Sequence, residues 1–393
     1  MIKKLLHQLS RLGTLEFLLI AFFTWRLLIT VFGLLGILFL PVGSPFLGGS
    51  EGANEENYLY LRLPLFWGWA NFDGVHYWQI AKTGYSQFQQ AFFPFFPLLV
   101  RVSANFLGGL LFSGLIITHL CFFISLYLFY HLARLDFKKP VVKLALILLL
   151  FFPTSFYFGS FYTESLFLSL SLASFYAARK KSWLWAGVLG GFASATRLAG
   201  IFLLPALVVE AVEQARLKKG QVKIKDLLPL LLIPFGLSIY MFYLWRSVGD
   251  PFYFFHVQPL FGAHRSGSNL VLLYQVFWRY LKIFLTVPLG HPYFIAVLEL
   301  ASFILFFALL IIGWVSKRIR LSYLVFGFGL LLLPTLTGTL SSIPRYVLPI
   351  FPGFLILAYY LERIKFLKWL FILAGLILGL VCTMLFIRGY WIS

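Results

Sequence analysis

The chain has 393 residues, of which 61% are hydrophobic and only 11% are charged. This composition excludes a soluble protein of that length, and repeated apolar runs of about 20 residues predict a helical protein that crosses the membrane many times. The net charge of +19 lies mainly in six short clusters of Lys and Arg between the apolar runs, whereas a nucleic-acid-binding surface would gather it in one patch. We therefore expect no nucleic-acid partner and interpret the clusters as cytoplasmic loops.

The first apolar run, about Leu15 to Leu40, is far longer than the hydrophobic region of a signal peptide. It predicts a retained span that leads outward from a cytoplasmic N-terminus. A long outer loop follows, at about residues 41–101. The positions of the basic clusters then predict three spans that lead inward, outward and inward again, at about 108–132, 143–158 and 163–178.

The next apolar segment, about Trp183 to Val209, begins at one basic cluster and ends at another. Both of its ends must therefore lie on the same side of the membrane. Small residues surround a single arginine, Arg197, in the middle of the segment. We predict two short helices that meet at a break near Arg197. Such breaks occur at membrane depth only inside protein or beside a cavity.

The rest of the chain alternates in the same way. A span at about 227–247 leads outward to a second outer loop at about 249–282, and four more apolar runs follow. The sequence thus predicts an all-α polytopic membrane protein with about 11 helical segments in one domain, residues 1–393. The Trp and Tyr residues of the first outer loop predict helices at the membrane interface within that loop.

Polar residues stand out in the first outer loop, in the stretch NFDGVHYWQIAKTGY. Asp73 begins a plausible helix, where it is either an N-cap or a carboxylate that faces a cavity, and one role does not exclude the other. His76 shares the same helix face. A metal site would need further ligands, such as Glu55 and Glu56, because the loop contains no metal-binding motif. We expect no cofactor, with a divalent metal as the alternative.

Three further charged residues lie close to apolar runs. Glu164 either complements a helix N-terminus or belongs to a site. Arg197 needs a partner, which is either an acid or an anionic ligand. Arg345 is either an interfacial residue that extends to the membrane surface or a member of the same site.

Four sequence elements follow the pattern of a known family. The most specific element is in the first outer loop, where Phe72, Asp73, His76, Ile80, Ala81, Gly84, Tyr85, Ala91, Phe92, Pro94 and Pro97 match the motif aromatic–Asp–x–x–His, Ile–Ala–x–x–Gly–Tyr and Ala–Phe–x–Pro–x–x–Pro. The other three elements are FFPTSFYFGSFYTESLF around Glu164, ATRLAG around Arg197 and PRY at Arg345. Together they resemble the PIG-V-type mannosyltransferases, which add a mannose during the assembly of glycosylphosphatidylinositol anchors.

The resemblance implies a membrane glycosyltransferase of the GT-C fold. The chain looks like a prokaryotic relative of the family, which implies a location in the cell membrane. Its expected donor is a polyprenyl-phosphate hexose, with mannose as the expected sugar, and its acceptor is a hydroxyl of a lipid or glycan at the outer face. Asp73 is implied as the general base of an inverting transfer. The expected substrate-binding residues are His76, Tyr85, Glu164, Arg197 and Arg345, together with Gln258 and Arg265 of the second outer loop.

A polytopic transporter or lipid flippase is the alternative from another class, because broken helices and intramembrane charges occur there too. Such proteins commonly consist of two matched halves, whereas this sequence shows a single broken segment and one large first outer loop. A non-catalytic protein that retains the same fold is the third possibility.

Overall fold

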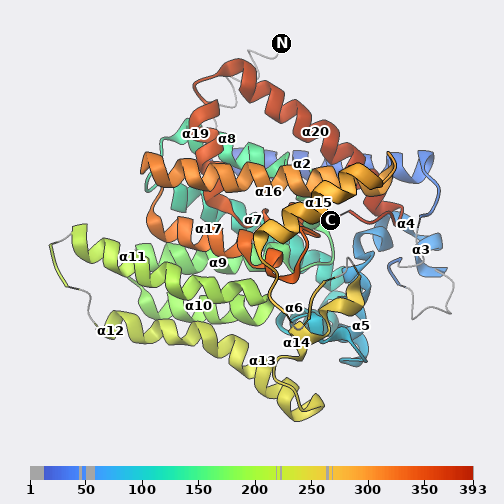
Figure 1. Cartoon of the computed structure of the whole chain (residues 1–393), viewed down its shortest axis with the longest axis horizontal. Helices are drawn as coiled ribbons and strands as arrows, with labels where there is room; N and C mark the ends of the chain where they lie inside the picture. The colour runs from blue at the N-terminus through green and yellow to red at the C-terminus, as the bar shows by residue number, and fades with distance from the viewer. Residues whose placement is uncertain are drawn as a thin grey trace.

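The computed structural model describes residues 13–43, 47–49, 58–217, 219–221, 224–262, 265–267 and 269–392. Within these residues all regular structure is helical. Most of the long helices lie in stacked rows, with α20 (Lys365–Ile387) at one edge and α13 (Leu232–Val248) at the other, as Figure 1 shows. The loops that carry α3, α4, α5 and α14 gather at one end of these rows.

Among the described residues, six helical segments are long and apolar enough to cross a membrane, so the chain is a multi-pass integral membrane protein. They are α2 (Thr14–Phe39), α7 (Leu110–Ala133), η4 with α11 (Leu198–Leu217), α12 through α13 (Ile224–Val248), α16 (His291–Ser316) and α20. The remaining predicted runs contain shorter helices: α8 (Lys139–Leu150), α9 (Glu164–Arg179), α10 (Trp183–Thr196), α17 (Leu321–Leu332) and α19 (Phe351–Leu361).

Prolines explain two of the shorter helices. The sequence predicts one span at 143–158, but α8 ends at Leu150 and a 3₁₀ turn, η3 (Ser155–Gly159), follows. Pro153 lies between them, and a proline has no amide hydrogen and disfavours helical geometry in the residue before it. α17 likewise ends at Leu332, before the 3₁₀ turn η7 (Pro334–Thr337).

The predicted break at Arg197 is present. α10 ends at Thr196, Arg197 is extended with φ −153° and ψ 144°, and the 3₁₀ turn η4 (Leu198–Phe202) leads into α11 (Leu203–Leu217). Near the end of α11, Gln214 Nε2 donates a hydrogen bond of 3.0 Å to the carbonyl of Ala178 at the end of α9. Since α10 starts directly after α9, the broken segment returns to the end at which it began.

The first outer loop contains a series of short helices, as predicted: α3 (Tyr58–Arg62), α4 (Pro64–Trp67), η1 (Gly68–Ala70), α5 (Asp73–Thr83), η2 (Gln89–Ala91) and α6 (Phe95–Leu107). The start of α5 is fixed by Asn71. Its side-chain amide donates to the carbonyl of Phe386 at 2.8 Å, and its backbone carbonyl accepts from the Tyr162 hydroxyl at 2.7 Å. The loop is thereby joined to the end of α20 and to the turn before α9.

The second outer loop holds α14 (Tyr253–His256), η6 (Gln258–Phe261) and α15 (Leu273–Thr286). The sequence analysis treats residues 249–282 only as a loop, so α15 is a finding of the structure. One face of α15 buries Val276 and Tyr280, while Trp278 and Leu285 are exposed. Its apolar face against the protein was missed because the helix is shorter than a membrane span.

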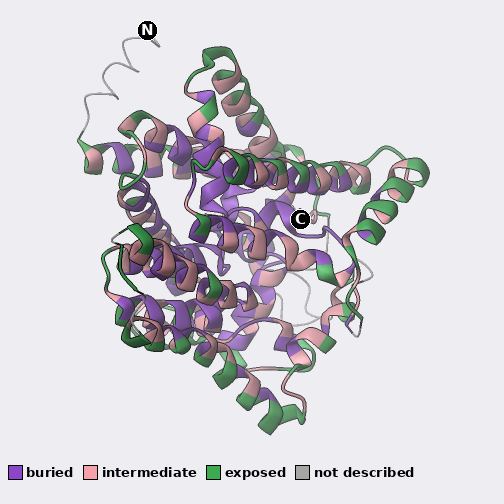
Figure 2. Ribbon diagram, turned by 60° about the vertical axis from the view of Figure 1, so that its left-hand side comes forward, coloured by how far each residue is buried: buried purple, intermediate pink, exposed green. Residues whose placement is uncertain are grey.

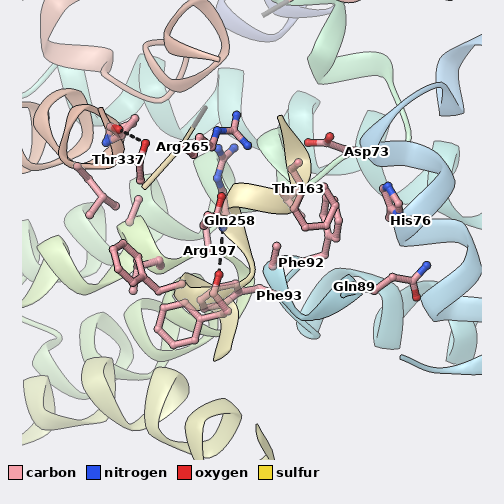
Figure 3. A pocket seen from close by; sticks show the side chains of 18 of the residues that line it. Asp73, His76, Gln89, Phe92, Phe93, Thr163, Arg197, Gln258, Arg265 and Thr337 are labelled. Atoms are coloured by element: carbon pink, nitrogen blue, oxygen red, sulfur yellow. Dashed lines mark hydrogen bonds between the residues drawn. The ribbon is translucent and has the colours of Figure 1, made fainter. Parts of the chain in front are cut away.

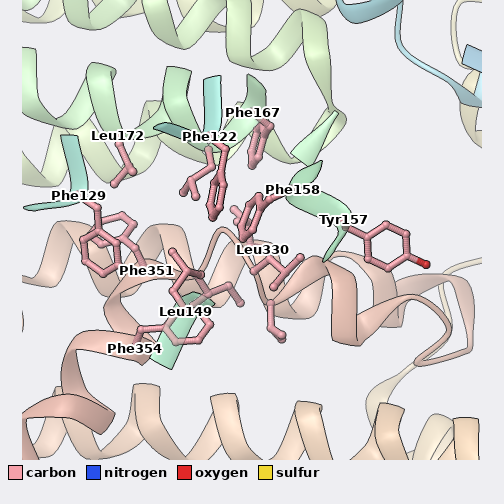
Figure 4. Close-up of a cluster of buried hydrophobic side chains, with 14 of the residues drawn as sticks. Phe122, Phe129, Leu149, Tyr157, Phe158, Phe167, Leu172, Leu330, Phe351 and Phe354 are labelled. Carbon is pink, nitrogen blue, oxygen red and sulfur yellow. The ribbon is translucent and has the colours of Figure 1, made fainter. Parts of the chain in front are cut away.

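Aromatic residues fill the interior between α7, the turn before α9 and α19 (Figure 4). The rings of Phe122 and Phe158 are stacked with centroids 4.3 Å apart, and Phe175 packs against Phe351 at 5.6 Å. Figure 2 shows this buried interior surrounded by exposed outer helix faces. Large apolar residues such as Leu27 and Phe242 lie exposed on long helices, as expected for surfaces that face lipid.

Candidate active site

A cavity of about 960 Å³ lies where the helix breaks and the two outer loops meet. Its wall is formed by the start of α5, residues 87–93, the turn before α9, the break after α10, α13, the second outer loop and residues 333–346. Non-helical backbone at these breaks therefore borders a cavity, which is where a membrane protein tolerates it. Figure 3 shows side chains from these segments pointing into the same space.

Asp73 is the first residue of α5 and lies one position after the N-cap, so its side chain is not at the capping position. The N-cap position is occupied by Phe72, whose φ of 55° and ψ of −115° are strained for a residue with a Cβ. Such a conformation costs about 1–3 kcal/mol and persists only where surrounding contacts hold it. The ring of Phe72 packs edge-on against Trp391 at 5.1 Å. The capping role is thus not the role of the Asp73 side chain.

The Asp73 carboxylate is instead paired with an arginine from the far end of the sequence. Arg345 Nη1 donates to Asp73 Oδ2 at 2.5 Å, and Arg345 Nε lies 3.3 Å from Glu164 Oε1. The same Glu164 oxygen accepts from Arg197 Nη1 at 2.7 Å. Asp73, Arg345, Glu164 and Arg197 thus form a line of alternating charges, which we call the site chain. All four line the cavity.

Burial explains why the site chain is paired. The side chains of Arg345 and Arg197 are each 9% exposed and that of Glu164 is 1% exposed. Charges taken out of water are stable only when opposite charges and hydrogen bonds compensate them. The acid that Arg197 needs is therefore Glu164, and Arg345 is a buried member of the site rather than an interfacial arginine that extends to the membrane surface.

The surroundings of Asp73 and His76 shift both of their pKa values downward. Burial alone would raise the pKa of Asp73, but the charge and hydrogen bond of Arg345, with smaller effects of His76 and Arg265, lower it below the ordinary value. Burial lowers the pKa of His76, against the opposing effect of the Asp73 charge. Near pH 7 the site therefore holds an ionised Asp73 beside a neutral imidazole.

His76 is held between aromatic rings. Its imidazole stacks on Phe92, with centroids 4.7 Å apart and planes 19° apart, and it meets Phe261 edge-on at 5.6 Å. Its Nδ1 atom is buried and has no hydrogen-bond partner among the described residues. The ring is therefore fixed in place while one of its polar atoms is unsatisfied.

The second outer loop brings Gln258 and Arg265 to the same cavity. Gln258 Nε2 donates to the carbonyl of Phe254 at 3.0 Å, and Arg265 Nη2 makes long contacts of 3.4 Å to the hydroxyls of Ser341 and Ser342. Tyr85 is the one predicted residue that does not line the cavity. Its hydroxyl donates to the carbonyl of Phe92 at 2.6 Å, so its position supports a structural role.

Trp391 and the apolar wall of the cavity were not found from the sequence. Trp391 follows the last span and carries no motif, so only its position in the folded chain identifies it. Leu237 and Met241 of α13 and Leu336 of η7 form part of the apolar wall. Their hydrophobicity is indistinguishable in sequence from that of residues that face lipid.

Among the described residues no group of three or more His, Cys, Asp or Glu is placed to hold a metal ion. Glu55 and Glu56, the two further ligands considered from the sequence, lie outside the described residues.

The fold and the site together define a multi-pass membrane protein with a large cavity that presents an ionised carboxylate and several arginines. The sequence model of the PIG-V mannosyltransferases matches residues 59–242, a range that includes Asp73, His76, Glu164 and Arg197. Over these residues, somewhat less than half of its length, the chain is similar to this family of mannosyltransferases. Arg345 lies beyond the matched range and reaches the site through the fold.

Among solved structures, the chain is similar to the oligosaccharyltransferase of Archaeoglobus fulgidus, crystallised with a tethered acceptor peptide. The TM-score is 0.43 and the sequence identity is 13%. The alignment covers 94% of this chain and 55% of the oligosaccharyltransferase, so the chain spans about half the length of that protein. No curated protein sequence matches the chain significantly.

Proposed function

We propose that the protein transfers a hexose, expected to be mannose, from a polyprenyl-phosphate donor to a hydroxyl group of a lipid or glycan acceptor. The transfer takes place at the outer face of the cell membrane and inverts the anomeric configuration, with Asp73 as the general base. The observation that carries this proposal is the ionised carboxylate of Asp73, held by Arg345 at the wall of a 960 Å³ cavity. The whole chain acts as one catalytic domain of the GT-C type.

Asp73 is better suited to act as the base than Glu164. Its side chain is 19% exposed towards the cavity, compared with 1% for Glu164, whose Oε1 already contacts two arginines. In the proposed step, the acceptor oxygen forms a bond to the anomeric carbon as the bond from that carbon to the phosphate oxygen breaks. The acceptor proton passes to Asp73, and the phosphate leaves as an anion.

The charges of the site suit a single phosphate group. Arg197, Arg265 and Arg345 carry three positive charges into the cavity wall, and Asp73 and Glu164 carry two negative charges. The net positive charge matches the single negative charge of a sugar phosphodiester. Arginines hold phosphate oxygens through charge-assisted hydrogen bonds, and they stabilise the charge that develops on a leaving phosphate.

The apolar part of the cavity suits the donor's hydrocarbon chain. Leu237 and Met241 lie on α13, a candidate membrane span, and face the same cavity as the charged residues. A polyprenyl chain that extends along this wall would keep the sugar phosphate at the depth of the site chain. Burial of apolar surface, at about 25 cal/mol per Å², would then contribute to donor affinity.

The proposed orientation rests on charge. The described residues of the basic clusters lie at the ends of the helices away from the two outer loops, which supports a cytoplasmic location for them. The cavity then lies at the outer face. The N-terminal cluster, expected to be cytoplasmic, falls in residues outside the described ranges.

The decisive experiment measures sugar transfer from a labelled polyprenyl-phosphate mannose in membranes that contain wild-type protein or Asp73→Asn at equal protein levels. Wild-type transfer and a loss of at least about a hundredfold in the variant are expected, as for removal of a general base. Transfer that survives Asp73→Asn would contradict the mechanism, and absence of transfer from every polyprenyl-phosphate hexose by the wild type would contradict the donor class.

A further inference from the structure

Three buried polar atoms in the wall of the cavity have no hydrogen-bond partner among the described residues: Glu164 Oε2, His76 Nδ1 and Arg345 Nε. A buried polar atom without a partner destabilises the fold, and native folds satisfy the great majority of such atoms. All three belong to residues linked to Asp73, because Arg345 contacts both carboxylates and His76 lies one helical turn after Asp73 on α5.

The pairing of the site chain explains which of these atoms are available to a ligand. Glu164 Oε1 accepts a hydrogen bond from Arg197 and forms an ion pair with Arg345, whereas Oε2 of the same carboxylate remains unsatisfied. The two arginines fix the orientation of that carboxylate, and Phe92 and Phe261 fix the orientation of the His76 ring. Rigid, unsatisfied polar atoms in a cavity are a suitable recognition site for a ligand with several hydroxyl groups.

We propose that Glu164 Oε2 and His76 Nδ1 form the subsite that recognises the transferred hexose. One sugar hydroxyl donates to Glu164 Oε2, and another exchanges a hydrogen bond with His76 Nδ1. This inference rests on the proposed function and adds to it the residues that select the sugar. It separates recognition of the sugar from recognition of the phosphate, which falls to the arginines.

The subsite has a direct consequence for selectivity. A donor that lacks the hydroxyl bound by Glu164 leaves a buried carboxylate oxygen unpaired, so the enzyme should discriminate strongly against it. A donor that lacks a hydroxyl directed elsewhere should be transferred with little loss. The protein should therefore respond sharply to deoxygenation at one or two positions of the hexose and weakly at the others.

The test compares two phosphodiester lipids of equal charge that differ in the sugar. Binding of polyprenyl methyl phosphate and of polyprenyl-phosphate mannose is measured without acceptor, by native mass spectrometry of the full chain. The dissociation constant of the sugar-free lipid divided by that of polyprenyl-phosphate mannose gives the contribution of the sugar to binding. We expect His76→Phe, which keeps the ring stacking but removes the nitrogen atoms, to reduce this ratio about threefold to tenfold. Glu164→Gln should reduce it more than tenfold, since it removes a charged acceptor.

The control is His119→Phe. His119 is also a partly buried histidine packed against phenylalanine, and its buried Nε2 also lacks a partner among the described residues, but it lies in α7 and does not line the cavity. This variant should leave the ratio unchanged. A folding defect would weaken both lipids together, whereas loss of the subsite weakens only the sugar-bearing lipid.

An unchanged ratio in both His76→Phe and Glu164→Gln would overturn the sugar subsite and leave the role of Asp73 intact. Failure of the proposed function looks different, because it appears as sugar transfer that persists in Asp73→Asn. A third readout uses deoxy donors. The hydroxyl whose removal costs wild type most should cost Glu164→Gln little, and equal losses in both proteins would place that hydroxyl away from Glu164.

Discussion

Two ionic networks lie at opposite ends of α9, one at Glu164, its first residue, and the other at Arg179, its last. At the second end Glu210 is fully buried, and both of its carboxylate oxygens are used. Arg320 donates to them at 2.9 and 3.0 Å, and Ser322 donates at 2.6 Å. We call this group the inner network.

The inner network continues through Arg179, which donates two hydrogen bonds of 2.6 and 2.9 Å to Asp136. It joins the loop after α7 and the end of α9 to the middle of α11 and the start of α17. None of these described residues lines the cavity. Glu210 is satisfied by protein atoms alone, and a network of this kind serves stability and the relative placement of helices.

The site chain differs from the inner network in what it leaves unused. Glu164 is as buried as Glu210, yet its Oε2 lacks a partner and borders a cavity. Burial and charge are therefore similar at both ends of α9. The state of the hydrogen bonds separates them, since a fully bonded carboxylate supports the fold and a partly bonded carboxylate beside a cavity supports binding.

Among substitutions that test the difference between the two networks, removal of Arg345 should have the largest effect on stability and on sugar transfer. Arg345→Leu leaves Asp73 without its cation and Glu164 with one arginine, and breaking a buried pair in this way costs about 3–5 kcal/mol of stability. We also expect sugar transfer to fall at least about a hundredfold, because the base and the phosphate lose the same cation. Thermal unfolding and labelled transfer in detergent measure the two effects. Arg246→Gln, which removes an exposed arginine from the end of α13, serves as the control.

Glu210→Gln should separate the two networks. The variant removes the negative charge to which Arg320 and Ser322 donate hydrogen bonds, so we expect a loss of about 3 kcal/mol in the free energy of unfolding. Transfer per folded molecule should stay within about twofold of wild type, because Glu210 acts far from the chemistry. A loss of specific activity comparable to that of Asp73→Asn would show that the inner network takes part in the reaction.

The pH dependence of sugar transfer should show how far Arg345 lowers the pKa of Asp73. Because the pKa of Asp73 is lowered below its ordinary 3.8, the base stays ionised down to that pH and is lost only as the pH falls further. Arg345→Lys should move this acid limb to higher pH by about one unit, since one ammonium replaces a planar guanidinium that reaches both carboxylates. An acid limb above pH 5 in the wild type would contradict the assignment of Asp73.

The smallest expected effect is that of Ser322→Ala. It removes one hydrogen bond to Glu210 and leaves those from Arg320, so we expect a stability loss of about 1–2 kcal/mol. Transfer per folded molecule should be unchanged. A loss of activity without a loss of stability would contradict the assignment of the inner network to stability alone.

Hydropathy and the placement of basic residues were sufficient to predict the membrane class, most of the long helices and the break at Arg197. These signals are local: an apolar run of sufficient length must cross the membrane, and a segment flanked by basic clusters must return. The helix boundaries near Pro153 and the helix over Leu273–Thr286 were not predicted. A helix end at a proline and an amphipathic helix at a protein surface depend on which neighbours are available to pack against them.

The sequence by itself determined which ionisable residues are candidates for the site, because ionisable side chains in an apolar chain are costly and few. Only the tertiary structure decided how they are combined. Asp73 and Arg345 are separated by 272 positions, and Glu164 and Arg197 by 33. No local pattern encodes such pairings, since they arise when buried charges find opposite charges during packing. The cavity, its apolar wall and the unsatisfied atoms of Glu164 and His76 exist for the same reason: they are properties of the space between segments, which no single segment contains.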